Sequence, residues 1–595
     1  MGFIKPSPQP VEPAEFLVLP LRERMRTLST TWVEDGFGTP RVLHVIYILK
    51  MFGLYLGGGL LIAAATSNAT VFEPGSWWDN IVVYQKLAAW LMLLELIGLG
   101  GAWGPLCGHF KPMTGNIRYW LRPGTIRMAP WGSRVPGTAG DTRTLLDVGL
   151  YLAALAGLVV PLAASGVDVV GVAGQQVVPG WAFVPVLVLM PLLGLRDKVI
   201  FLAGRSEQYL PIMLYSAVFA DDFTNLVVAY KIVIVCVWIG AGVSKIGDHF
   251  VNVVPPMVSN SPAMPGKASR RLFYRDFPRD LRPSRLAWFM AHIGGTLVEI
   301  AIPVTLLLTT NATIALLGAV AMLLFHLFIT STFPLAVPLE WNVFFGFAAI
   351  TLWVGKDPSA YSIYDFSPAW ALLPIFALAL AFPVLGNLRP DLVSFLPSMR
   401  QYAGNWASAV WAMKPGVEER LNELPNVHNQ VDQLVEMKYE PDDAEMTLQK
   451  TIAWRTMHSQ GRGLFSALYH HLDDIEERTV REGELVCNTL VGWNFGDGHL
   501  HDHRLVAAVQ RRLGLQPGDL VVVWVESQPI FRHTQAYQVI DAALGVVERG
   551  TWDVRDCVAE QPWLPNGPVD LDVTWAAPGY QRRRTLTART FEHPA

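Results

Sequence analysis

The chain has 595 residues, of which 51% are hydrophobic and 16% are charged, whereas soluble proteins carry about 25% charged residues. This composition excludes an ordinary soluble protein, and the net charge of −4 gives no reason to expect a nucleic-acid partner. The four cysteines have no paired spacing, which argues against a disulfide framework and a thiolate zinc site.

A polar segment opens the chain, covers residues 1–40 and lacks the pattern of a signal peptide. A helical membrane domain is predicted over residues 41–390. The segment at 206–221 is short for a crossing, since about 20 apolar residues are needed, so the predicted number of spans is nine or ten. The predicted spans lie at about 43–65, 87–106, 145–164, 181–195, 206–221, 223–245, 286–308, 312–333, 341–354 and 370–385.

The distribution of basic residues favours ten crossings. Loops 107–144 and 246–285 are rich in arginine, whereas loop 66–82 carries acidic residues and no lysine or arginine. Cytoplasmic loops of membrane proteins are enriched in lysine and arginine. We therefore expect a multi-pass protein of the plasma membrane, with both arginine-rich loops and the C-terminal region in the cytoplasm.

Ionisable side chains inside the apolar segments are candidate site residues, because a charge at membrane depth is costly and is usually functional. Lys245 follows the small residues Ala241 and Gly242, where neighbouring helices can approach closely. His292 and Glu299 are seven residues apart and are expected on one helix face. A neutral lysine in an apolar pocket can act as a general base. The alternative interpretation is structural: long side chains snorkel to the membrane surface, and histidine and glutamate can bond neighbouring helices.

Four short motifs stand out in the second half of the predicted membrane domain. They are Ala241-Gly-Val-Ser-Lys245-Ile, His292-Ile-Gly-Gly-Thr-Leu-Val-Glu299, Phe325-His326 and Arg205-Ser-Glu207-Gln-Tyr-Leu. In their order and spacing they resemble the membrane domain of the vitamin K-dependent γ-carboxylases, also called the horizontally transferred transmembrane family. The similarity covers roughly residues 180–355, and the whole chain also resembles an uncharacterised actinobacterial, chiefly mycobacterial, transmembrane family.

The resemblance implies that Lys245 deprotonates a reduced naphthoquinone such as menaquinone, in a site that also holds Glu207, His292, Glu299 and His326. Glu207 stands where the carboxylases have histidine, so carboxylation itself is not implied. We expect a quinone- or lipid-dependent membrane enzyme whose partners are membrane lipids and a quinone. The alternative is a non-enzymatic lipid-binding or assembly scaffold with a cytoplasmic interaction domain, and a homo-oligomer or a protein partner stays open.

The C-terminal region is predicted to contain an interfacial, helical linker at 391–450 and a soluble α/β domain at 451–595. The tryptophans of residues 401–415 indicate an interfacial helix. Within the α/β domain, the patterns predict strands at 484–491 and 519–526 and helices at 503–513 and 534–549.

A histidine-rich stretch in the C-terminal domain is a candidate site for zinc or another divalent metal, because carboxylate and imidazole are common metal ligands. The alternative is a glycine-rich loop that leads into a helix with Asp502 as its N-cap. The candidate ligands are Asp497, His499, His501 and His503.

Overall fold

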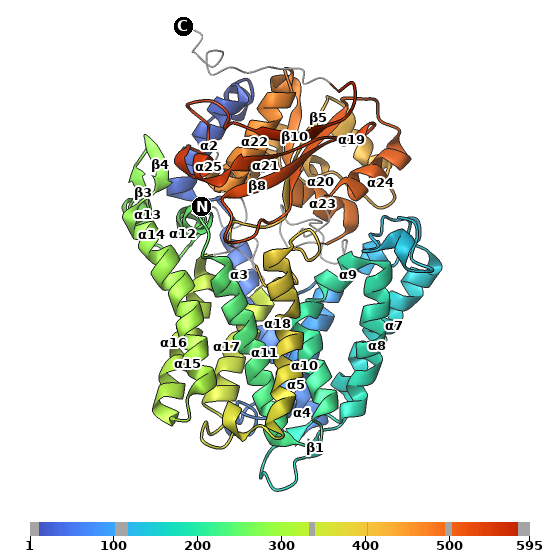
Figure 1. Ribbon diagram of the computed structural model, residues 1–595, viewed down its shortest axis with the longest axis vertical. Helices are drawn as coiled ribbons and strands as arrows, with labels where there is room; N and C mark the ends of the chain where they lie inside the picture. The colour runs from blue at the N-terminus through green and yellow to red at the C-terminus, as the bar shows by residue number, and fades with distance from the viewer. Residues whose placement is uncertain (1–10, 101–116, 333–338, 401–402, 494–501, 581–595) are drawn as a thin grey trace.

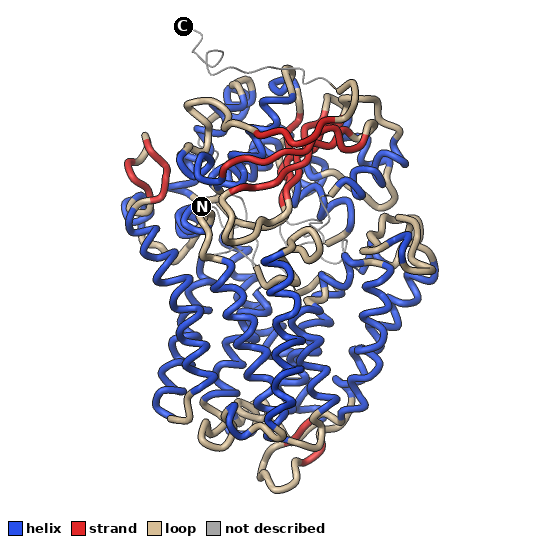
Figure 2. Tube along the Cα trace, in the orientation of Figure 1, coloured by secondary structure: helices blue, strands red, loops and turns tan. Residues whose placement is uncertain are grey.

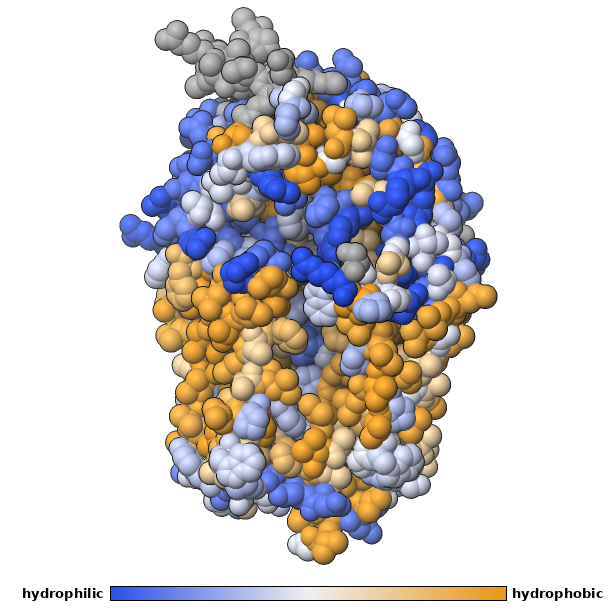
Figure 3. Space-filling view, turned by 45° about the vertical axis from the view of Figure 1, so that its right-hand side comes forward, coloured by the Kyte–Doolittle hydropathy of each residue, from blue (hydrophilic) through white to orange (hydrophobic). Residues whose placement is uncertain are grey.

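The computed structural model describes residues 11–100, 117–332, 339–400, 403–493 and 502–580 (Figure 1). A layer of helices forms one half of the molecule, and a sheet with its own helices forms the other half (Figure 2). Apolar side chains cover the helical half, and polar side chains predominate on the other half (Figure 3). The helical half therefore has the surface of a membrane-embedded region.

Six helices of the described residues are long and apolar enough to cross a membrane. By length and composition the structure therefore gives six candidate spans, fewer than the nine or ten that the sequence predicts. Two of the six are α-helices interrupted by a π-helical segment. The six are α3–η1–α4 (Arg41–Leu49, Lys50–Gly57, Gly58–Thr66), α7 (Leu145–Ala163), α11 (Phe223–Ser244), α14–η6–α15 (Arg285–Phe289, Met290–Leu297, Val298–Leu308), α16 (Ala312–Thr332) and η8–α18 (Ala369–Ala371, Leu372–Leu388).

The other four predicted spans are shorter helical segments that lie in the same layer (Figure 1). The helix α5 has 16 residues and is buried almost all round, so neighbouring helices rather than lipid surround it. At 1.5 Å per residue it is about 24 Å long, which is less than the roughly 30 Å hydrocarbon core. The four are α5 (Ile81–Leu96), η4–α8 (Gly180–Phe183, Val184–Arg196), α10 (Ser206–Val218) and α17 (Leu339–Trp353).

The N-terminal segment and both basic loops lie on the side of the C-terminal domain. Helix α2 (Leu21–Asp35) packs on α21 (Pro441–Met457). In the first basic loop, Asp141 pairs with two arginines of α24 (His503–Leu513), and its oxygen lies 3.2 Å from Arg512. In the second, Arg282 donates to the carbonyl oxygen of Ala559 at 3.1 Å.

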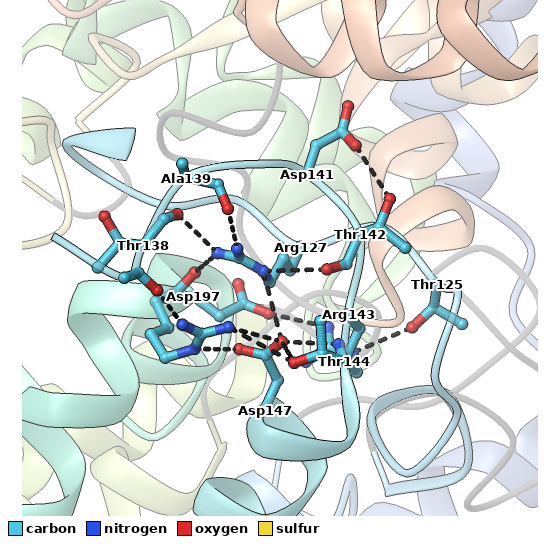
Figure 4. Close-up of polar contacts among 12 residues, drawn as sticks. Thr125, Arg127, Thr138, Ala139, Asp141, Thr142, Arg143, Thr144, Asp147 and Asp197 are labelled. Carbon is cyan, nitrogen blue, oxygen red and sulfur yellow. Dashed lines mark hydrogen bonds and ion pairs between the residues drawn. The ribbon is translucent and has the colours of Figure 1, made fainter. Parts of the chain in front are cut away.

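Two arginines of the first basic loop, Arg127 and Arg143, take part in a buried ion-pair network at the end of α7 (Figure 4). Arg143 lies 2.8 Å from Asp197, and both side chains are fully buried. Arg127 donates to the carbonyl oxygens of Thr138 at 3.1 Å and Thr142 at 3.2 Å. These charges therefore hold the loop against the ends of α7 and α9 (Lys198–Ala203). They also add positive charge on the side of the C-terminal domain.

The C-terminal domain contains a six-stranded antiparallel sheet in the order β10-β9-β8-β7-β5-β6. The predicted strand at 519–526 and the predicted helix at 503–513 are confirmed as β7 and α24. Helices α21 and α22 (Ser459–His471) pack together. The strands are β5 (Ser408–Met413), β6 (Thr479–Glu482), β7 (Leu520–Val525), β8 (Thr534–Asp541), β9 (Gly545–Asp553) and β10 (Asp572–Ala576).

Three other predictions for this domain are wrong. The predicted interfacial helix at 401–415 contains β5, which is buried along its whole length between β6 and β7. Short apolar runs of this kind fit a core strand and a buried helix equally well. The predicted strand at 484–491 is α23 (Gly483–Val491), and the predicted helix at 534–549 is the hairpin of β8 and β9. Gly545, with φ +82°, permits the turn at the start of β9.

The remaining elements are short and connect these parts. They are α1 (Pro13–Leu17), α6 (Ile117–Trp120), α12 (Val254–Asn260), α13 (Gly266–Arg271), α19 (Val417–Arg420), α20 (Gln430–Glu436), α25 (Val554–Ala559), β1 (Val167–Asp168), β2 (Gln176–Val177), β3 (Tyr274–Asp276), β4 (Asp280–Pro283) and the 3-10 turns η2 (Pro74–Ser76), η3 (Gly132–Arg134), η5 (Phe250–Asn252), η7 (Ile363–Asp365), η9 (Leu421–Glu423) and η10 (Ile475–Glu477).

Candidate functional site

A cavity of about 300 Å³ lies among α11, η6, α16, α17 and α12, at the end of the helical layer nearest the C-terminal domain (Figure 1). Most of its wall is aromatic or aliphatic. The polar residues on the wall are few, and they include three of the five residues that the sequence singled out. The polar wall residues are Gln208, Lys245, Glu299, His326 and Asn342.

Lys245 and Glu299 form a buried ion pair on the cavity wall. Lys245 is the C-cap of α11, and a methyl group added to Gly242 would come within 2.8 Å of Ile300. The glycine therefore allows the helix that carries Glu299 to approach the end of α11 closely. The Lys245 ammonium also lies 5.4 Å from the ring centroid of Phe250, in the range of a cation–π contact.

His326 is held between two neighbours on the cavity wall. The indole Nε1 of Trp238 donates to His326 Nε2 at 2.9 Å, and His326 Nδ1 lies 2.9 Å from Asn342 Oδ1. Because an indole N–H can only donate, Nε2 accepts and the ring proton is on Nδ1. His326 is therefore neutral in this arrangement, with both ring nitrogens engaged, and it orients Asn342 rather than offering a free base.

His292 does not join this group. It is half-buried beside Trp288, with ring centroids 4.8 Å apart, whereas Gly294 and Gly295 line the cavity. The reason is the π-helical segment η6 between His292 and Glu299. A π-turn takes more residues than an α-turn, so a spacing of seven no longer places both side chains on one face.

Glu207 is buried beside the cavity rather than on its wall. It lies in the first turn of α10, and the next residue, Gln208, lines the cavity. Close to Glu207, Arg205 pairs with Glu340, with 3.9 Å between Nε and Oε1. The Arg205 guanidinium lies 5.2 Å from the ring centroid of Trp341, which also lines the cavity. A second buried polar cluster thus adjoins the cavity.

Sequence reasoning missed Gln208, Trp238 and Asn342 as wall residues. A signal existed for Trp238, because it precedes Lys245 by seven residues in an uninterrupted α-helix and so shares its face. Lys231, by contrast, is outside the cavity wall, and its ammonium donates to the carbonyl oxygen of Tyr361 at 2.6 Å.

Three of the predicted metal ligands, Asp497, His499 and His501, lie outside the described residues. The fourth, His503, begins α24, and Asp502 caps this helix by accepting from the backbone N–H of Arg504 at 3.0 Å. The N-cap role that the sequence suggested for Asp502 is confirmed. Within the described parts of the chain, no group of three or more His, Cys, Asp or Glu side chains could hold a metal ion.

The model of a family described as transmembrane protein of unknown function (DUF3556) matches residues 1–574. No curated protein and no solved structure matches the chain. None of these comparisons links the chain to the carboxylase-like family.

Proposed function

The chain belongs to this family of transmembrane proteins, and from that premise we propose that it binds a membrane-soluble quinone or lipid in the cavity beside Lys245 and exchanges a proton with it. The observation that carries the proposal is a buried ion pair on the wall of a mostly apolar cavity, inside helices long and apolar enough to cross a membrane.

The energetics favour a functional role for the pair. Two charges taken out of water lose several kcal/mol of solvation each, and their attraction offsets this only with good geometry. A cavity beside the pair adds a further cost, because the wall atoms lack packing partners. A ligand in the cavity supplies those contacts, so ligand binding accounts for both features together.

The proposed chemistry is two successive proton transfers, whose net result moves one proton from the ligand to Glu299. The Lys245 ammonium gives a proton to the Glu299 carboxylate, which becomes a neutral acid. The neutral amine then accepts the hydroxyl proton of a bound hydroquinone. The result is a hydroquinone anion beside a restored ammonium, which stabilises the new negative charge in a medium of low dielectric constant.

Ligand retention tests this proposal. We expect the purified wild type to retain one class of quinone or lipid, identified by mass spectrometry, and Lys245→Ala to lose it by about tenfold or more. The double variant Lys245→Met/Glu299→Leu removes both charges, leaves neither unpaired and is expected to lose the ligand too. Lys231→Met is the matched control, since it removes a buried lysine of the same helix outside the cavity wall. Equal retention in all four proteins contradicts the proposal.

The alternative function, a scaffold with an interaction domain, is favoured by a different observation. Strand β10 is the terminal strand of the described sheet, and every one of its residues is exposed. Exposed edge strands are templates for pairing with another chain. A stable partner or dimer in mild detergent, lost when Val573 is replaced by lysine, is the outcome that favours the scaffold.

A further inference from the structure

We infer that the ligand has a compact polar head and a hydrocarbon tail, and that the tail leaves the cavity between η6 and α16 into the bilayer. The ligand then enters sideways from the membrane rather than from water. This inference rests on the proposed function and adds the shape of the ligand and its route.

The cavity is too small for a whole membrane lipid. Its volume is about 300 Å³, which corresponds to roughly ten water-sized volumes at ~30 Å³ each. That space holds a ring or a small head group. A ligand that dissolves in the membrane also carries a long apolar part, so this part lies outside the cavity.

The wall has an outer rim between η6 and α16. Phe328 lines the cavity and is nevertheless 40% exposed, on the surface that faces lipid. Gly294, on η6, also lines the cavity and is half-buried. Helix α16 packs against the neighbouring helix mainly along α15, which follows the π-helical segment η6, and much less along η6 itself. The pair of helices therefore diverges toward the end where the cavity lies.

The two glycines of η6 have different roles at this rim. A methyl group added to Gly295 would come within 2.7 Å of the Phe250 ring, so this glycine packs against the wall. A methyl group added to Gly294 would meet no atom within 4 Å. Gly294 therefore borders open space, and its helical backbone accepts a side chain without strain.

The end of the cavity toward the C-terminal domain is covered. Val254 and Val258 of α12 line the cavity and are buried. Just before α12, His249 Nδ1 lies 2.9 Å from Ser459 Oγ of α22, which anchors this segment to the domain. The side toward η6 and α16 is the more open one, and apolar residues such as Leu297 and Leu324 flank it on the lipid-facing surface.

Two probes separate the head from the tail: a naphthoquinone with a long isoprenoid tail and the same ring without a tail. We expect Gly294→Trp to weaken binding of the tailed probe by about tenfold and to weaken binding of the tail-free probe by several-fold less. The matched control is Gly149→Trp on α7, an exposed membrane-helix glycine whose added methyl group, like that of Gly294, would meet no atom within 4 Å. This control is expected to leave both affinities unchanged.

A second measurement uses the wild type and needs no folded variant. A tailed naphthoquinone with a photoreactive group at the end of its tail is expected to label residues 285–332, as read by peptide mass spectrometry. Equal labelling of all lipid-facing helices overturns the route, as does an equal effect, or no effect, of Gly294→Trp on both probes. If neither probe binds the wild type, the proposed function fails, and the inference fails with it.

Discussion

At the scale of single residues, the Lys245–Glu299 pair makes a prediction about stability. Removing one partner leaves the other charge buried and unpaired, which typically costs about 3–5 kcal/mol, whereas replacing both by apolar groups is often neutral. We expect Lys245→Met to lower the free energy of unfolding by about that amount in mild detergent. The double variant Lys245→Met/Glu299→Leu is expected to recover most of the loss. Additive losses from the two substitutions contradict a direct pairing.

The same residues show what sequence can and cannot predict about the site. Lys245 was identifiable because a lysine beside small residues in an apolar segment is unusual. Glu299 was also a candidate, but its direct pairing with Lys245 was not predictable, because the two residues are 54 apart in the chain and the packing of the whole bundle decides which helices meet. His326 was also a candidate and lies on the cavity wall, but its neutral form follows only from the observed bonds to Trp238 and Asn342.

At the scale of elements, the contact between the segment before η5 and helix α22 is expected to depend on pH. Burial lowers the pKa of His249 from its usual value near 6.5 to about 4, and that of His458 to about 3. Both histidines are neutral in the folded protein, while the unfolded chain takes up protons near pH 6.5. Stability from these groups is therefore complete above about pH 6.5 and is lost as the pH falls toward 4 and below.

The expected size of the effect from His249 is about 3 kcal/mol at the acidic limit. Hydrogen exchange of residues 245–260 and 455–471, followed between pH 7 and pH 4, measures it. His249→Gln keeps a polar side chain beside Ser459 and removes the titration, so its exchange is expected to change less steeply with pH. An equally steep change in this variant shows that other groups control the contact.

Elements differ in how far their sequence determines them. The six long helices were predictable because about 20 apolar residues have few alternatives in a membrane. Strand β5 was not predictable, because its sequence Ser-Ala-Val-Trp-Ala-Met shows no regular alternation of apolar and polar residues. It forms a strand because β6 and β7 pair with it on either side. The π-helical segment η6 gave no signal beyond Gly294-Gly295, yet it decides that His292 lies away from Glu299.

At the scale of the whole molecule, the packing of α2 on α21 restricts the topology. Both ends of the membrane domain lie on the same side, so the chain crosses the membrane an even number of times. The six candidate spans satisfy this condition, as do ten if the four shorter segments are counted, and the arginine-rich loops lie on the side of the C-terminal domain. Loop 66–82 contacts the β1–β2 hairpin, where the backbone N–H of Asn68 donates to Gln176 Oε1 at 2.8 Å, and this hairpin lies at the far end of the helical layer (Figure 1).

We therefore predict that the C-terminal domain faces the cytoplasm, and single cysteines test it. Of the native cysteines, Cys236, Cys487 and Cys557 are buried, so a Cys107→Ser background is expected to react little with a membrane-impermeant maleimide. In that background, Ala173→Cys, exposed in the β1–β2 hairpin, is expected to be labelled on intact cells. Ala268→Cys, exposed in the second basic loop, is expected to be labelled only after permeabilisation. The reverse pattern contradicts the orientation. Labelling of both sites on intact cells contradicts the odd number of crossings that is expected between the β1–β2 hairpin and the second basic loop.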